Sequence, residues 1–271
     1  MKRRSIILIL LIVSGAALMA FGLKTAKEEW QTGVALYSFN QHPFPQAIAM
    51  ADSTGTKLVE GFSFYKLGPA FNNLTMADLS PSDVERMKQM LAAKGLSMPS
   101  MYFSGGKNLA EWKKYFELGR EFGLKCIVCE PEKKQLGMID SLAGVYKIKI
   151  AIHEHEKPDI YCDPDSLFKF IKGYKNIGAC ADIGHWVRSG YDPVKSLKKL
   201  RGHVVELHIH DNDKAQKDVD LGTGTIDFAA LTKELKQQHF TGILFYECEH
   251  DMKNNTQNVK RGMAYLQANV K

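Results

Sequence analysis

Histidine and carboxylate side chains gather at a few points from residue 130 onward in this 271-residue chain, each time at the end of a short apolar run or just after it. Six of the nine histidines lie in or beside these groups. The groups are Glu130, HEH at 153–155, DIGH at 182–185, HIHD at 208–211 and ECE at 247–249. Side chains two residues apart share one face of a β-strand, so several of these groups would point the same way. Mixed imidazole and carboxylate ligands suit manganese, zinc, cobalt or iron better than magnesium or calcium, so the pattern predicts one divalent metal site.

A scaffold must bring these groups together, and the apolar runs indicate which one. Runs typical of β-strands recur every 25–40 residues or so, the length of one βα unit. They begin near Val34, Leu58, Met98, Cys126, Lys149, Ile177, Val204 and Gly242. Eight units without a linker predict an α/β fold, a single (β/α)₈ TIM barrel over residues 33–271, whose reactive groups stand at the carboxyl ends of the strands. A doubly wound open sheet is disfavoured because no glycine-rich phosphate turn follows an early strand.

Helix-start and helix-stop residues separate the predicted strands. Ser80 and Pro81 open one helical segment, and Asn108 and Gly123 bracket the next. Asp-Pro pairs at 163–164 and 192–193, and Asp227, are expected to open three more. The segment 133–147 is expected to be a poorer helix, because two glycines interrupt it.

The N-terminus carries a targeting pattern. Lys2, Arg3 and Arg4 precede an apolar run over residues 6–23, with small residues around Ala20. This predicts a signal peptide or N-terminal anchor over residues 1–22, and hence a periplasmic or secreted protein. Contact with a membrane is expected only if the segment stays uncleaved. The same three residues supply half of the formal net charge of +6, and the other basic residues are spread out, so no nucleic-acid partner is expected. The sequence leaves a homodimer open.

The five cysteines do not form a disulfide framework, because their number is odd and their spacing wide. Cys126 and Cys129 form a CxxC motif, but they lie in an apolar run that reads as a strand. Residues three apart face opposite sides of a sheet, so a zinc or redox pair is not expected here.

Three stretches resemble a known family. They are GACADIGHWVRSGYDPVKSLKKLRGHVVELHIHD at 178–211, LGTGTIDFAAL at 221–231 and GILFYECE at 242–249. They are similar to the xylose isomerase-like barrels described as sugar-phosphate isomerases and epimerases. The resemblance implies one metal with four ligands, of which Asp182, His208 and Glu247 match three. The family's glutamate on the fifth strand is replaced by His153. Either Glu130 on the fourth strand completes the set, which we favour, or His153 is itself the fourth ligand.

The resemblance and the residues together predict a metal-dependent isomerase or epimerase of a small sugar or keto-sugar, acting through an enediolate intermediate. Glu247, His153 and His155 are the expected catalytic residues. His185 matches a family histidine that reaches substrate oxygens, and His210 and Glu60 are further expected substrate contacts. For Glu60, a solvated carboxylate at a strand end is an equal alternative.

Two other functions remain open, and a third is excluded. Histidine on the fifth strand resembles the inosose dehydratase side of the family, which makes a lyase that eliminates from a keto-sugar or glycoside the alternative enzyme. A non-catalytic exported sugar-binding barrel is the alternative outside catalysis. A trinuclear DNA-repair site like that of endonuclease IV is excluded, because the second and third strands end in GFSF at 61–64 and YFSGG at 102–106, without histidine.

Overall fold

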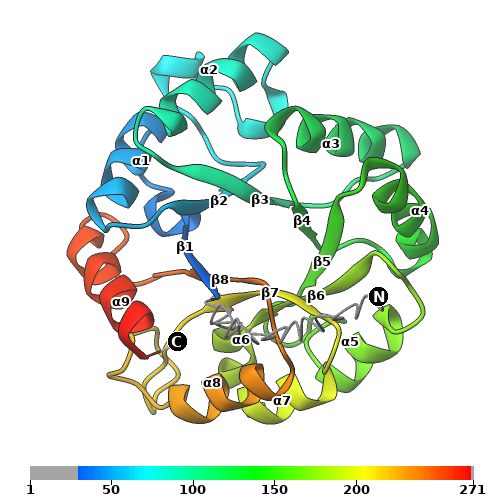
Figure 1. Cartoon of the computed structure of the whole chain (residues 1–271), viewed down its shortest axis with the longest axis vertical. Helices are drawn as coiled ribbons and strands as arrows, with labels where there is room; N and C mark the ends of the chain where they lie inside the picture. Colours follow the sequence, from blue (N-terminus) through cyan, green and yellow to red (C-terminus); the bar gives the residue numbers. More distant parts are fainter. Residues whose placement is uncertain (1–29, 270–271) are drawn as a thin grey trace, which may run out of the picture.

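Eight parallel strands close into a barrel in the order of the chain (Figure 1). The computed structural model describes residues 30–269, so the predicted signal peptide or anchor at 1–22 lies outside the described residues. The strands are β1 (Gln31–Ala35), β2 (Leu58–Phe62), β3 (Ser97–Phe103), β4 (Cys126–Cys129), β5 (Lys149–His153), β6 (Ile177–Asp182), β7 (Val204–Ile209) and β8 (Ile243–Tyr246). Strand β8 pairs with β1, with Thr32 opposite Leu244, so the sheet has no open edge. The predicted (β/α)₈ barrel is confirmed.

Helices form a ring around the outside of the barrel (Figure 1). The α-helices are α1 (Phe44–Ser53), α2 (Pro81–Ala92), α3 (Leu109–Phe122), α4 (Leu136–Tyr146), α5 (Pro164–Ile171), α6 (Ile183–Arg188), α7 (Pro193–Lys199), α8 (Phe228–Gln237) and α9 (Thr256–Asn269). Short 3₁₀ turns are η1 (Leu36–Phe39), η2 (Pro69–Phe71), η3 (Met76–Asp78) and η4 (Lys133–Gln135). No helix in the described part of the chain is both long enough and apolar enough to cross a membrane.

The helix signals in the sequence act as predicted. The Asn108 side chain accepts hydrogen bonds from two backbone N–H groups at the start of α3, and Gly123 ends that helix with φ +75°. Helices α5, α7 and α8 are capped by the side chains of Asp163, Asp192 and Asp227, each of which accepts one hydrogen bond from a backbone N–H group. The expectation of a poor helix after β4 is wrong. Helix α4 runs for 11 residues because its apolar face is buried, which outweighs the cost of its two glycines.

The two cysteines of the CxxC motif are buried in β4, and both thiols are free. Cys126 packs with Val128, Ala151 and Cys180 in a small separate cluster, whereas Cys129 belongs to the main core. The two side chains therefore pack in different layers, as the alternation along a strand predicts.

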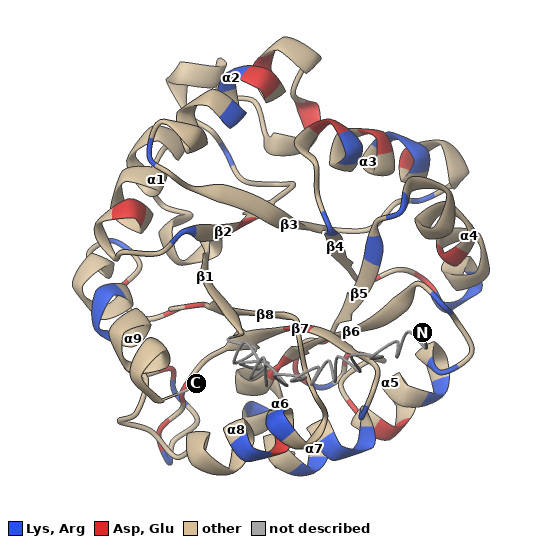
Figure 2. Cartoon of the chain, in the orientation of Figure 1, with Lys and Arg blue, Asp and Glu red and all other residues tan. Residues whose placement is uncertain are grey.

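Charged side chains cover the outside of the ring. Figure 2 shows Lys and Arg on helices all around the barrel, interspersed with Asp and Glu. Among the described residues, the positively charged side chains are thus spread over the outer helices and do not gather in one patch.

Candidate functional site

A cavity of about 270 Å³ opens at the carboxyl ends of the strands. Strands β1 to β3 and the turns after them contribute aromatic side chains, and β5 to β8 contribute imidazoles and carboxylates. The lining residues are Tyr37, Phe62, Phe64, Tyr102, Ser104, His153, His155, His185, His208, Glu247 and Glu249. The barrel mouth is where this fold places ligands, so the predicted position of the site fits the cavity.

Asp182, His208 and Glu247 converge at the base of this cavity. Each offers one donor atom, and these atoms lie within 4.8 Å of one another. His208 Nδ1 lies 3.1 Å from Glu247 Oε2 and 3.8 Å from Asp182 Oδ2. Asp182 Oδ2 and His208 Nδ1 are buried and have no hydrogen-bond partner among the described residues. Buried polar atoms without partners are rare, and a divalent cation would satisfy both of these atoms.

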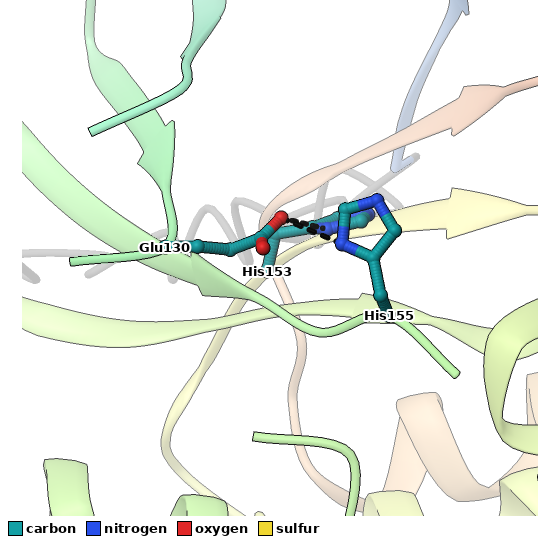
Figure 3. A group of neighbouring side chains, drawn as sticks. All are labelled: Glu130, His153 and His155. Carbon is teal, nitrogen blue, oxygen red and sulfur yellow. Dashed lines mark hydrogen bonds and ion pairs between the residues drawn. The ribbon is translucent and has the colours of Figure 1, made fainter. Parts of the chain in front are cut away.

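His153 stands between this group and Glu130. Its Nε2 atom lies 3.5 Å from Asp182 Oδ2, and its Nδ1 atom lies 3.1 Å from Glu130 Oε1. The same carboxylate oxygen lies 2.8 Å from His155 Nδ1 and accepts a 2.6 Å hydrogen bond from the Tyr102 hydroxyl. Figure 3 shows both imidazoles turned toward Glu130. Glu130 is therefore grouped with His153 at the end of β5 and His155 just after it, on the side of His153 away from Asp182.

The contacts between Glu130 and His153 favour the charged form of both side chains. Burial by itself would raise the pKa of Glu130, but hydrogen bonds from His153 and His155 outweigh it and hold the pKa well below its usual range. Burial would lower the pKa of His153, but the neighbouring carboxylates of Asp182 and Glu130 raise it to about 9. An imidazole nitrogen must be free of its proton to bind a metal, so metal binding at Nε2 would be coupled to proton release.

Beneath the cavity, Glu60 contacts His208 from inside the barrel. Glu60 Oε2 lies 2.8 Å from His208 Nε2, and both side chains are buried. Glu60 is fully buried, so it is not a solvated carboxylate. It also does not line the cavity, so it is not placed to contact a substrate there. Glu206 lies beside it and accepts a hydrogen bond from Ser100. Burial, and then the charge of Glu60, raise the pKa of Glu206 to about 8. The sequence reasoning missed Glu206, although it shares the inward face of β7 with His208.

His210 is buried behind the site and is absent from the lining of the cavity. Its Nε2 atom lies 3.2 Å from Asp182 Oδ2 and 3.7 Å from Glu247 Oε2, and its Nδ1 atom lies 3.3 Å from Asp218 Oδ1. Asp218 Oδ2 in turn lies 2.8 Å from His250 Nδ1. The sequence predicted that His210 contacts substrate. In the structure its ring packs against the carboxylates of Asp182 and Glu247, on their buried side. Asp218, in the loop after β7, was not foreseen.

His185 lies at the rim of the cavity, one turn into α6. Asp182 caps that helix by accepting a 2.8 Å hydrogen bond from the His185 backbone N–H. The His185 ring has Nε2 3.7 Å from Asp182 Oδ2 and Nδ1 2.9 Å from Arg188 Nη2. Burial is the main cause that lowers the pKa of His185 to about 4, so the ring is neutral at physiological pH. A neutral imidazole has one N–H donor and one acceptor nitrogen, so His185 can form a hydrogen bond with a ligand hydroxyl.

The glycine-bearing loop after β7 is organised by Asp211. Its buried carboxylate accepts hydrogen bonds from the backbone N–H groups of Gly222, Gly224 and Ile226. A Cβ atom on Gly224 would lie 2.2 Å from Asp211 Oδ1, so the close approach requires glycine. Asp211 thus fixes the conformation of the LGTGT segment.

Comparisons with known proteins agree with this architecture. Residues 51–269 match the family described as xylose isomerase-like TIM barrel. An inosose dehydratase from Clostridium botulinum (strain Eklund 17B / Type B) is 24% identical over 252 residues, which cover 72% of this chain and 84% of the relative. A crystal structure from Parabacteroides distasonis ATCC 8503 is 30% identical, with a TM-score of 0.72, and the match covers 88% of this chain and 98% of that one. A structure of L-ribulose 3-epimerase, 14% identical, has a TM-score of 0.70, with 89% and 95% covered.

Proposed function

Because this chain belongs to the xylose isomerase-like TIM barrel family, we propose that it is a metal-dependent enzyme that isomerises or epimerises a small sugar or keto-sugar through an enediolate intermediate. The observation that carries the proposal is the convergence of buried, unpartnered donor atoms from Asp182 and His208 on Glu247, at the base of a cavity. A hydroxy-ketone can present two adjacent oxygens to such a site.

We assign the metal to Asp182, His208 and Glu247, with His153 as the fourth ligand. The sequence analysis favoured Glu130 as the fourth ligand. In the structure Glu130 contacts Nδ1 of His153, whereas Nε2 of that ring faces Asp182, so we assign Glu130 the role of orienting His153. A metal-binding histidine commonly carries a carboxylate on its other nitrogen, and Glu60 stands in the same relation to His208. When bound, a manganese, zinc, cobalt or iron ion would act as a Lewis acid and stabilise negative charge on substrate oxygens.

Glu247 and His155 are the groups we assign to proton transfer. The neighbouring imidazoles of His208 and His210 outweigh the effect of burial and hold the pKa of Glu247 well below its usual range, so it is a carboxylate at neutral pH. His155 lines the cavity with its side chain about half exposed, and Glu130 holds its Nδ1 atom. One group can remove a proton beside a carbonyl while the other returns it on another face or carbon. His185, being neutral, would orient substrate hydroxyls.

The substrate we propose carries no phosphate. Among the described residues that line the cavity there is no Lys or Arg. Arg188 lies close by, but it already contacts Glu156 and lies 3.3 Å from Glu249 Oε2. Phosphate groups are normally held by cations or helix N-termini aimed at them, so a free sugar, a keto-sugar or a glycoside fits this cavity better.

A dehydratase is the second candidate. Two observations favour it, the similarity to an inosose dehydratase and the histidine at the end of β5, where the family resemblance implies glutamate. Both reactions begin with loss of a proton beside a carbonyl. They differ in the next step, because an epimerase returns the proton and a lyase expels a leaving group on the neighbouring carbon.

Proton exchange in D₂O tests the proposal. The Mn²⁺-loaded protein would be incubated with a panel of ketoses, cyclic keto-sugars and keto-glycosides and followed by NMR and mass spectrometry. We expect solvent deuterium at a carbon beside the carbonyl, with retained mass otherwise, and loss of that signal in Glu247→Gln. A product that has lost one water identifies the dehydratase. Binding without exchange across the panel would contradict catalysis and leave a sugar-binding barrel.

We also propose that the protein is exported, on the strength of the basic and apolar pattern of residues 1–22. The intact mass of protein recovered from a periplasmic fraction tests this. A mass that corresponds to loss of about twenty N-terminal residues is expected. Protein found only in the cytoplasm would contradict export.

A further inference from the structure

One wall of the cavity consists of four aromatic rings. Tyr37 lies in η1, Phe62 at the end of β2, Phe64 in the turn that follows, and Tyr102 on β3. Phe62 is central, with ring centroids 5.5 Å from Tyr37, 5.7 Å from Phe64 and 5.7 Å from Tyr102. Phe64 also meets the rings of Tyr37 and Tyr102 edge-on, at 6.2 and 5.9 Å. These four rings, the aromatic wall, form one continuous apolar surface.

The aromatic wall is held by a hydrogen bond at one end and is exposed at the other. The Tyr102 hydroxyl donates a hydrogen bond to Glu130, which fixes that ring beside the fifth-strand histidines. Phe62 is buried beneath its neighbours, but Phe64 is 42% exposed. A large apolar ring left exposed within a cavity lining, and contiguous with other rings, is the usual mark of a ligand contact.

The rest of the cavity lining is polar, and apart from Ser104 it comes from the ends of β5 to β8. His155, His185 and Glu249 lie there, next to the carboxylates and imidazoles at its base. A ligand that fills the cavity must therefore be polar along one side and apolar along the other. An open-chain polyol carries hydroxyl groups on all sides. A six-membered carbohydrate ring in a chair has an edge of hydroxyls and a face of axial C–H groups, which packs against aromatic rings.

We infer that the substrate binds as a six-membered carbohydrate ring, with one C–H face against the aromatic wall and its oxygen-bearing edge toward Asp182 and Glu247. The inference rests on the proposed function, since it names the substrate class of the same site. Phe64 is the main determinant of this preference, because its ring is the exposed one and can be covered by ligand.

Saturation-transfer difference NMR on the Zn²⁺-loaded protein tests the inference without turnover, because Zn²⁺ is diamagnetic and belongs to the metals that suit the site. The probes are methyl β-D-glucopyranoside, myo-inositol and sorbitol at equal concentrations, with aromatic protein protons irradiated. We expect strong transfer to the axial protons on one face of the pyranoside, and weak transfer to sorbitol. A myo-inositol signal above that of the pyranoside would identify a cyclitol as the ring. Transfer to sorbitol equal to that of both rings, or to none of the three, would overturn the inference.

Variants of the aromatic wall sharpen the test. Phe64→Ala is expected to weaken ring binding about tenfold, and Phe64→Tyr to restore it, since the aromatic face is kept. Leu109→Ala is the matched control, because Leu109 is 45% exposed at the start of α3 and does not line the cavity. Unchanged ring binding in Phe64→Ala would overturn the inference while leaving the proposed reaction intact. Normal ring binding without proton exchange would leave the inference standing and reject the reaction.

Discussion

Glu130 is the residue whose replacement separates the two possible ligand sets. In the arrangement proposed here it supports His153 through a 3.1 Å contact with Nδ1, while Nε2 of the same ring faces Asp182 at 3.5 Å. Glu130→Gln keeps the shape of the side chain and removes its charge. The perturbation should therefore reach a bound metal only through the orientation and basicity of His153.

The expected loss of metal affinity in Glu130→Gln is moderate, because Glu130 acts on the metal only through His153. Replacing the partner of a metal-binding histidine typically weakens metal binding about 10- to 100-fold, or roughly 1.4–2.7 kcal/mol. His153→Ala removes a ligand outright and should weaken binding more than Glu130→Gln does. If Glu130 were the ligand, the order would be reversed, with the larger loss in Glu130→Gln.

Titration of the apo protein with Mn²⁺ by calorimetry measures both variants against the wild type. Glu121→Gln is the control, since Glu121 is an exposed glutamate on α3. Circular dichroism would establish that each variant is folded. Wild-type affinity in His153→Ala would refute the proposed ligand set. Wild-type affinity in Glu130→Gln would refute the supporting role of Glu130.

Three further predictions concern the surroundings of the site. Glu60→Gln should weaken Mn²⁺ binding by a similar 10- to 100-fold, measured in the same titration, because Glu60 holds the far nitrogen of His208. Chelation should lower the melting temperature of the wild type in a thermal scan, since a metal at 100 times its Kd adds about 2.7 kcal/mol of stability, and a scan unmoved by chelator would contradict this. Burial would raise the pKa of Asp218, but hydrogen bonds from His210 and His250 lower it to about 2. Because that folded-state pKa lies below the unfolded value of about 3.9, its contribution of roughly 2 kcal/mol is present above pH 4 and lost as the pH falls toward 2. Asp218→Asn should flatten the acid-unfolding curve over that interval, and an unchanged curve would count against the Asp218 contacts.

The barrel could be predicted from the sequence because its signals are local. Each strand is a short apolar run, and caps such as Asn108 and Asp163 act within one helical turn. Helix α4 was misjudged for the complementary reason. Its glycines are a local signal, whereas the burial of Leu136, Ile139 and Leu142 against the barrel is a tertiary effect.

The site could be predicted only in part. Strand alternation and the closed barrel place Asp182, His208 and Glu247 at one mouth, and the same alternation would have drawn attention to Glu206. It could not decide how His153 and Glu130 divide their roles, which depends on side-chain directions between neighbouring strands. Asp218 lies in a loop, and nothing in the sequence indicates that this loop folds back onto His210.

The central claim is that one divalent metal binds among Asp182, His208 and Glu247. Anomalous diffraction at the manganese edge, from crystals equilibrated with Mn²⁺, tests it most directly. We expect a single strong peak about 2.0–2.3 Å from donor atoms of these three residues, with His153 Nε2 as the fourth ligand. No peak at this position, or a peak confined to the neighbouring group of Asp218, Cys248 and His250, would contradict it.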